Sequence, residues 1–330
     1  MTTPSTAVAP ARAYVTPSIT VEQGPLRAPQ RVHAVAIVVV PTMGLVAALV
    51  LARRIGVSAL DVGLLVGMFT ATILGISVGY HRLFSHRSFE AARPIRVLLG
   101  VLGSMAGQGS LTYWVSNHRR HHHYADRPGD IHSPYYREDQ PIAGLRGFWN
   151  AHMGWTFEHQ LTNPLVFAKD LYRDPVIARV NQLYLLWVLV GLLLPSAVGG
   201  LVTRSGTGAL TGFLWGGLVR LFFTYHFTNA IDSVNHIFGR RIFDTGDWST
   251  NNVWMVMPTM GEGWHNNHHA FPSSAVFGFR WWQVDPGGLL IRAWERLGWA
   301  WGLQVPTAQA IAEKAAAGDS RRRPPAAREG

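Results

Sequence analysis

Four stretches of the chain are apolar over the length that a membrane-spanning helix requires. They contain few or no charged residues and cover residues 34–52, 62–80, 183–202 and roughly 207–227. A helix needs about 20 consecutive apolar residues to cross the hydrocarbon core of a bilayer. The connections between the first and second stretch, and between the third and fourth, are short. The pattern therefore predicts an all-α integral membrane protein with four transmembrane helices in two hairpins.

A fifth apolar stretch, residues 97–115, is also long enough to span, but it contains four glycines, two serines and Gln108. If it crossed the membrane, the histidines at 81–86 and those at 118–123 would lie on opposite sides. Irregular or polar segments are tolerated along the membrane interface or where protein buries them. We therefore expect an interfacial or re-entrant helix over 97–115.

Basic residues predict the orientation in the membrane. Segment 81–180 contains 12 Arg and Lys residues and segment 232–330 contains 10, whereas the two hairpin loops contain two and one. Cytoplasmic loops carry the excess of basic residues. We therefore expect both termini on the cytoplasmic side, with residues 81–180 and 232–305 forming a helical cap there. The chain has only two lysines, which is typical of a GC-rich bacterial genome and indicates a bacterial inner (plasma) membrane.

Both ends of the chain are poor in large apolar residues. Residues 1–30 are rich in Pro, Thr and Ala, and residues 306–330 include a run of three arginines followed by two prolines. Such segments cannot bury enough apolar surface to fold. We expect two unstructured tails around one domain at 31–305.

Composition limits the chemistry further. The absence of cysteine excludes disulfides, thiolate metal sites and cysteine nucleophiles, so any metal must bind nitrogen or oxygen. The net charge of +10 is compatible with nucleic acid, an anionic membrane face or an acidic partner. For a protein with four predicted spans we expect the lipid bilayer and no nucleic acid.

Histidine is the residue whose distribution points to chemistry. Most of the 15 histidines fall in three short clusters, with sequences HRLFSH, HRRHHH and HNNHH, and in a fourth place where Asp232 precedes His236 by four residues. Two clusters share the spacing H-x-x-H-H, which on a helix places three side chains on one face. His81 and His86 are five residues apart, so on an α-helix they bind different ions or straddle a helix end.

The number of candidate ligands favours two metal ions. A zinc site is complete with about four ligands and an octahedral ion with six, so nine histidines and a carboxylate are too many for one ion. Imidazole binds Zn, Cu, Fe and Ni alike, so the ligands do not name the metal. Five other histidines stand alone or are surplus in a cluster, and we expect them outside the site: His33, His123, His132, His159 and His226.

The segments HRLFSHRSF, WVSNHRRHHHYAD, DSVNHIFG and GEGWHNNHHAFP resemble the histidine boxes of membrane fatty acyl-CoA desaturases of the stearoyl-CoA type. Their order and spacing match over roughly residues 33–300. The resemblance implies four membrane helices below a cytoplasmic cap, a non-haem di-iron centre in the cap and a bent tunnel for the acyl chain. The metal ligands that it implies are His81, His86, His118, His121, His122, His236, His265, His268 and His269.

The resemblance also assigns residues around the metals. Gln108, Trp114 and Thr228 fall where the family places the substrate-binding residues at the kink of the tunnel. Asp232 stands where the family usually has Asn, which makes it a further candidate ligand, and Asn229 stands where a Trp is usual. Glu262, Asp126 and Asp130 are candidates to accept hydrogen bonds from the imidazoles. Arg220, inside the fourth span, should point away from lipid.

The implied reaction is an O2-dependent desaturation that introduces a cis double bond, of the delta-9 type, into a long-chain acyl-CoA or acyl-lipid. Metal-activated dioxygen is required because no side chain can oxidise an unactivated alkyl chain. The sequence carries no flavin, iron–sulfur or haem motif, so electrons must come from a ferredoxin-like or small haem protein with its reductase. Two alternatives stay open: a di-iron fatty acid or alkane hydroxylase, and a His-rich membrane protein that binds or transports metal.

Overall fold

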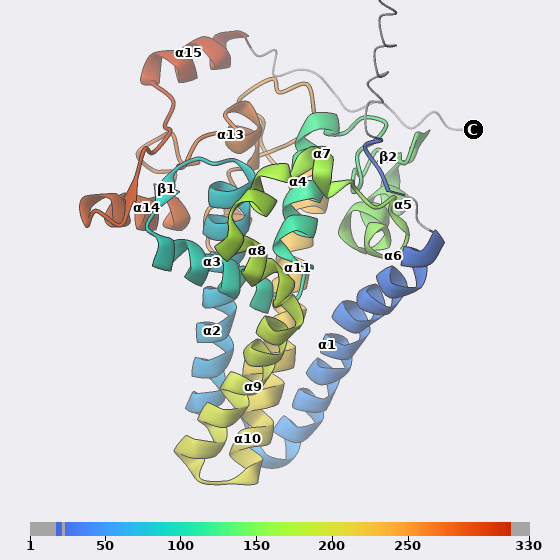
Figure 1. Ribbon diagram of the computed structural model, residues 1–330, viewed down its shortest axis with the longest axis vertical. Helices are drawn as coiled ribbons and strands as arrows, with labels where there is room; N and C mark the ends of the chain where they lie inside the picture. The colour runs from blue at the N-terminus through green and yellow to red at the C-terminus, as the bar shows by residue number, and fades with distance from the viewer. Residues whose placement is uncertain (1–17, 22–23, 318–330) are drawn as a thin grey trace, which may run out of the picture.

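The structure, a computed structural model, describes residues 18–21 and 24–317. Among the described residues, the regular secondary structure is helical apart from four strands of two residues each. Long helices form a stalk, and shorter helices and loops form a wider cap at one end of it (Figure 1). This is the mainly helical architecture that the sequence predicts.

The stalk contains four helical segments. These are α1 (Arg27–Ile55), α2 (Ala59–Leu74), α9 (Tyr184–Thr203) and a fourth made of α10 (Gly206–Gly212), η5 (Phe213–Val219) and α11 (Arg220–Ser233). The α2 helix continues directly into the π-helical segment η2 (Gly75–Ser85), and η5 is π-helical as well. The four segments pack along one another, and the N-terminal end of α1 reaches the cap at α6 (Trp155–Glu158).

Three helices of the described chain are long and apolar enough to cross a membrane. They cover Gly24–Ile55, Ala59–Ser85 and Tyr184–Thr203, and they match the first three predicted spans except that the third begins one residue later than predicted. The fourth predicted span, 207–227, is also helical, but its glycines and Arg220 lower its apolar character. The structure therefore supports three spans by length and composition, and the fourth stays a prediction.

Both hairpin turns are encoded locally. Gly56 ends α1 with φ of 79°, and Ser58 then begins α2 with a capping box in which Asp61 bonds back to the Ser58 backbone. In the second hairpin Arg204 adopts a left-handed conformation, and the Ser205 side chain accepts a hydrogen bond from the Gly208 backbone. Short turns of this kind hold consecutive helices antiparallel and close together.

The chain does not form one continuous helix over 97–115, and the interfacial or re-entrant placement of this segment stays a prediction. The chain forms α3 (Arg93–Met105) and α4 (Leu111–Tyr124), separated by a turn in which Gly107 and Gly109 have φ of 75° and 102°. Residues with a Cβ rarely adopt this conformation, so the glycines permit the break. After it, α4 runs up into the cap and carries the second histidine cluster.

Arg220 fixes the end of α3 to the stalk. Its guanidinium is fully buried and donates hydrogen bonds to the backbone oxygens of Met105 and Gly191, both at 2.6 Å, and of Gly216 at 3.2 Å. The expectation that this cation avoids lipid is confirmed. The contacts join α3, α9 and η5 at one point below the cap.

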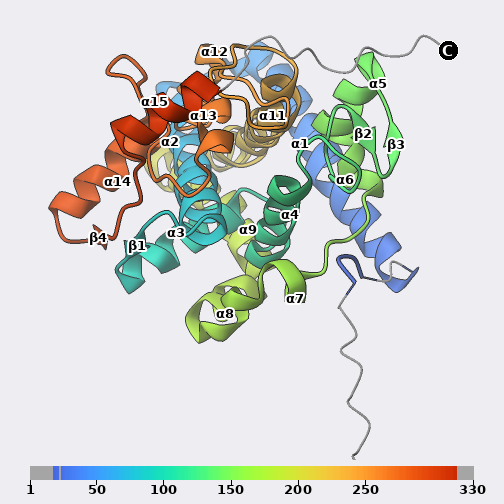
Figure 2. The same ribbon diagram turned by 90° about the horizontal axis from the view of Figure 1, so that it is seen from above.

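The cap is built from the segment between α2 and α9 and from the segment after α11, as Figure 2 shows from above. Strands β1 (Glu90–Ala91) and β4 (Ala300–Trp301) pair antiparallel, as do β2 (Tyr136–Arg137) and β3 (Gln140–Pro141). The remaining cap elements are α5 (Gly144–Trp149), η3 (Asn150–Gly154), α6, α7 (Pro164–Phe167), η4 (Lys169–Arg173), α8 (Pro175–Gln182), η6 (Val234–His236), α12 (Val253–Val256), α13 (His265–Ala270), α14 (Pro286–Arg296) and α15 (Ala308–Ala317).

The predicted tails are partly structured. In the N-terminal one, residues 24–26 form the helical turn η1 (Gly24–Leu26), α1 begins at Arg27, and Thr20 forms an isolated bridge with Thr162. In the C-terminal one, α15 is helical and Lys314 donates a hydrogen bond to the Ala270 backbone. These parts of the prediction are wrong, while residues 1–17, 22–23 and 318–330 lie outside the described residues.

Candidate metal centre

The nine histidines predicted as ligands come together in the cap as two adjacent groups. Within each group the candidate ligand atoms all lie within 4.8 Å of one another. The five-histidine group contains His81, His86, His118, His122 and His268. The four-histidine group contains His121, His236, His265 and His269. The His122 and His269 rings, one from each group, are 4.5 Å apart between centroids.

The two H-x-x-H-H motifs divide their side chains between the groups. In α4, His118 and His122 join the five-histidine group while His121 joins the other. In α13, His268 alone joins the five-histidine group. Each of these two helices therefore contributes histidines to both groups, and the helix face that carries its motif lies over the boundary between the groups.

The HRLFSH motif, which contains His81 and His86, depends on π-helical geometry. His86 follows η2 directly, and its backbone N–H donates to the His81 oxygen at 3.1 Å, five residues back. A π-helical turn aligns residues five apart, whereas an α-helix would rotate them away from each other. His81 and His86 therefore face the same group, so of the two alternatives, ligands of different ions or residues on either side of a helix end, the structure shows the second.

Distances between the imidazoles suit a metal ion. The Nε2 atoms of His86 and His118 are 2.8 Å apart, and those of His236 and His265 are 3.0 Å apart. Nitrogen ligands about 2.1 Å from an ion and at right angles to each other would lie about 3 Å apart. The Nε2 atoms of His121 and His269 are buried and have no hydrogen-bond partner among the described residues. Such atoms are rare in folded proteins, and an ion would satisfy both.

Four carboxylates accept hydrogen bonds from the Nδ1 atoms of four imidazoles. The Nδ1–H groups of His81, His236, His121 and His269 face Glu262 at 2.8 Å, Asp126 at 2.7 Å, Asp130 at 3.0 Å and Asp247 at 2.9 Å, respectively. An imidazole that donates from Nδ1 presents the lone pair of Nε2, which is the form that binds a metal. The prediction for Glu262, Asp126 and Asp130 is confirmed. Asp247 was not predicted, because it stands 22 residues before His269 with no motif around it.

Burial and neighbouring histidines keep four further imidazoles neutral. Burial lowers the pKa of His118, His122, His265 and His268 well below the usual range, and neighbouring histidines lower each pKa further. A neutral imidazole retains a lone pair near neutral pH. The five-histidine group is thus prepared for a cation, whereas in the four-histidine group Asp130 raises the pKa of His121 to about 9 and Asp126 raises that of His236.

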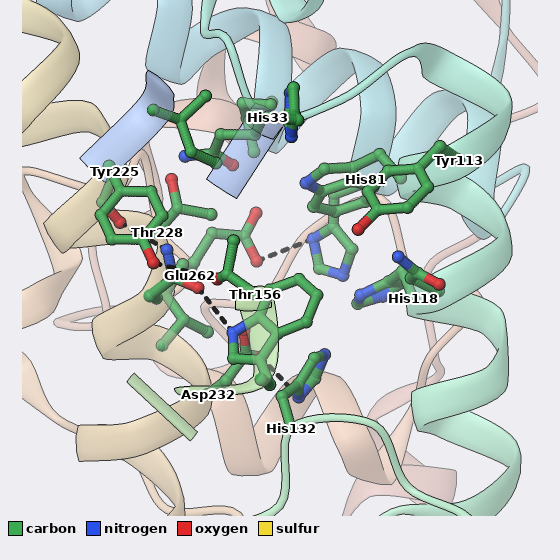
Figure 3. Close-up of a pocket in the computed structure, with 18 of the residues that line it drawn as sticks. His33, His81, Tyr113, His118, His132, Thr156, Tyr225, Thr228, Asp232 and Glu262 are labelled. Atoms are coloured by element: carbon green, nitrogen blue, oxygen red, sulfur yellow. Dashed lines mark hydrogen bonds and ion pairs between the residues drawn. The ribbon is translucent and has the colours of Figure 1, made fainter. Parts of the chain in front are cut away.

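A cavity lies beside the metal centre, between α4 and α11 (Figure 3). Its free volume is about 60 Å³, and His81, His118 and His265 form part of its wall. The three predicted substrate residues, Gln108, Trp114 and Thr228, all line it. The Trp114 ring stacks on His118 with centroids 5.0 Å apart, and Gln108 donates to the Thr224 backbone oxygen at 3.2 Å.

Asp232 faces this cavity and is in neither histidine group. Its carboxylate is 3.8 Å from Nδ1 of His132. Burial raises the pKa of Asp232 to about 7, although His121 and His236 lower it. The structure thus separates Asp232 from the nine histidines, and its role as a ligand stays a prediction.

His132 belongs to the site, although no motif in the sequence includes it. Its ring lies 4.5 Å from that of His121, and the two form a third cluster with Asp130. His33 also lines the cavity. The other excluded histidines lie elsewhere: His123 is exposed, His159 bonds with Tyr113, and His226 bonds with His152.

Asn229 stands where a tryptophan is usual in the family, and a tryptophan from another element lies beside it. Asn229 accepts a hydrogen bond at 3.0 Å from the indole of Trp155, which reaches it from α6 and also lines the cavity. An indole is therefore present beside this position although the local residue is Asn.

Comparison with known proteins agrees with this geometry. Residues 59–300 match the fatty acid desaturase family model. The chain is 42% identical over 299 residues to a hex-5-enoyl-[acyl-carrier protein] acetylenase of Moorena producens, covering 90% of this chain and 93% of that protein. It is 35% identical over 251 residues to an sn-1 stearoyl-lipid 9-desaturase of Anabaena variabilis, covering 75% and 85%. It is 35% identical over 244 residues to an icosanoyl-CoA 5-desaturase of Limnanthes douglasii, covering 72% and 63%.

The family match covers the stalk from α2 onward and all four histidine-bearing regions, and the relatives resemble the chain over most of its length. The chain belongs to the membrane fatty acid desaturase family of oxidoreductases.

Proposed function

We propose that this protein is an O2-dependent fatty acyl desaturase in which each histidine group holds one iron ion. The observation that carries the proposal is the convergence of nine imidazoles beside a cavity, with Nε2 of His121 and His269 buried and unpartnered among the described residues. The donor set is all nitrogen, which suits iron as well as other transition metals. The family supports the choice of iron.

The bound ions would supply the activation of dioxygen that an unactivated alkyl chain requires. Removing two hydrogens while O2 is reduced to two waters consumes two further electrons and two protons. We infer an external donor, a ferredoxin-like or small haem protein with its reductase, since the sequence carries no cofactor motif for electron transfer.

The chain's own residues would orient the ligands and the substrate. Glu262, Asp126, Asp130 and Asp247 fix the orientation of their imidazoles, so the site needs little rearrangement when an ion binds. The cavity would hold one pair of methylene groups against the centre and exclude bulk water. Trp114, stacked on His118, would position the chain at the point nearest the ligands.

The topology that fits this function has four spans with the cap and both termini in the cytoplasm of a bacterium. The distribution of basic residues supports the orientation. The three carbonyl contacts of Arg220 support a fourth span, because they remove its charge from lipid.

The substrate we propose is a long-chain acyl group on CoA or lipid, with a cis double bond placed as in the delta-9 enzymes. The sn-1 stearoyl-lipid 9-desaturases among the relatives support this position. A second candidate is the conversion of a double bond into a triple bond on a carrier-protein thioester, favoured by the 42% identity to the acetylenase. Both reactions remove two hydrogens and use the same site.

Expression in a desaturase-deficient bacterium, followed by mass spectrometry of the lipids and acyl thioesters, tests the function. We expect new products that lack two hydrogens, with the position and order of the new bond read from their fragments. Products that gain one oxygen atom instead would identify a hydroxylase, and the absence of any O2-dependent product in cells that make the folded protein would refute the proposal.

A further inference from the structure

A surface groove outside the metal centre lies between the N-terminal end of α1 and the α5–α6 region. Arg31 and Val35 line it from α1, and Leu145 and Trp149 line it from α5. Ile142 and, from α6, Phe157 add to its apolar side.

The lining of the groove is positively charged. Three arginines, Arg31, Arg137 and Arg146, stand against one acid, Glu158, which leaves a net charge of plus two. Arg31 and Arg137 both pair with Glu158, but all three side chains are more than half exposed, so these pairs are weak. Arg146 is exposed and forms no ion pair with any residue that the structure describes.

The other side of the groove exposes large apolar side chains. Leu145 is 87% exposed, Trp149 57% and Val35 47%. Apolar residues this exposed are costly in water but typical of a membrane interface, where Trp and Arg also gather. Arg31 and Val35 are about one helical turn apart, roughly 6 Å along the helix axis, and they stand on either side of residue 34, where the apolar stretch begins. The groove therefore lies at the level where α1 enters the hydrocarbon.

We propose that this groove binds an anionic phospholipid of the cytoplasmic leaflet. The phosphate would lie against the arginines, whose planar guanidinium groups bind phosphate oxygens in pairs. The acyl chains would run along Val35, Leu145 and Trp149 into the bilayer. The inference depends on the membrane orientation given under Proposed function and not on the reaction.

The groove is next to the cavity of the metal centre. Trp155 and Thr156 of α6 line the cavity, while Phe157 and Glu158 of the same helix line the groove. On α1, His33 and Ile37 line the cavity and Arg31 and Val35 line the groove. A lipid bound in the groove would thus contact the two helices that close one side of the cavity.

Fluorescence quenching tests the site with the full chain purified in detergent. Titration with brominated phosphatidylglycerol should quench a component of the tryptophan emission that is lost in the Trp149→Phe variant. Brominated phosphatidylcholine should quench it only at higher concentration. Arg146→Glu removes one positive charge and adds one negative charge. Each of these two changes near an anionic lipid alters the affinity about fivefold, so together they should weaken phosphatidylglycerol binding roughly 30-fold.

Arg292→Glu is the matched control, because Arg292 is an exposed residue of α14 outside the groove. It should bind phosphatidylglycerol as the unmodified chain does, and circular dichroism should show both variants folded. Unchanged binding by Arg146→Glu, an equal loss in Arg292→Glu, or full displacement of the lipid by the same concentration of glycerol phosphate would overturn the proposal. A protein that binds lipid as expected but yields no desaturated product would refute the proposed function and leave this site standing.

Discussion

The sharpest test of the imidazole geometry is the substitution Asp247→Asn. One oxygen of Asp247 faces Nδ1 of His269 at 2.9 Å, and the other accepts from the Ser249 backbone at 2.9 Å and from the hydroxyls of Ser249 and Thr245 at 2.6 Å. Asparagine has the same shape and keeps the second set through its carbonyl oxygen. Its amide N–H₂ then faces His269 and can only donate.

The substitution therefore acts on the proton of His269. A donor at Nδ1 favours the tautomer with its proton on Nε2, which is the buried, unpartnered atom that we assign to the ion. Removing a carboxylate of this kind typically costs 10–100-fold in metal affinity or activity, equivalent to about 1.4–2.7 kcal/mol. Because the loop keeps its other hydrogen bonds, folding should change little.

The assay is iron content by mass spectrometry after dialysis against graded chelator, together with turnover of an acyl substrate. We expect the variant to lose iron at 10–100-fold lower chelator concentration than the unmodified protein. Glu295→Gln, at an exposed position on α14, should lose nothing. A folded Asp247→Asn variant that retains iron and activity would refute the reasoning about His269.

Two further substitutions test other parts of the account. His265→Ala should abolish desaturation while the protein stays folded in the membrane, because it removes a ligand of the four-histidine group, and undiminished product would take this residue out of the site. Arg220→Met should lower the midpoint of thermal unfolding in detergent, since three buried carbonyls lose their donor at a cost of about 1–3 kcal/mol each, and an unchanged midpoint would mean that these contacts contribute little to stability.

Much of the fold follows from the lengths of the apolar stretches, and the parts that do not follow have local causes. The break in 97–115 depends on Gly107 and Gly109 adopting positive φ, and glycine content alone does not say which residues will do so. The helix α15 was missed although its sequence, AQAIAEKAAA, consists of residues with high helix propensity. An unstructured tail was predicted for this segment because prolines and arginines flank it.

The candidate site was predictable where ligands recur at fixed spacing and not where they depend on tertiary contacts. The histidine motifs identified all nine members of the two groups. Assignment to a group was not predictable, because it depends on the π-helical turn after α2 and on where α4 and α13 meet. His132 and Asp247 have no motif, and only the folded chain brings them to His121 and His269.

The central claim is that each histidine group binds one iron ion. X-ray absorption at the iron edge, with elemental analysis of protein produced without added metal, measures this directly. The account predicts about two iron ions per chain, each with a nitrogen-dominated shell at roughly 2.1 Å, and loss of about one ion in a variant with His236 and His269 both changed to Ala. A single ion, a shell dominated by oxygen, or protein that makes desaturated product without any transition metal would contradict it.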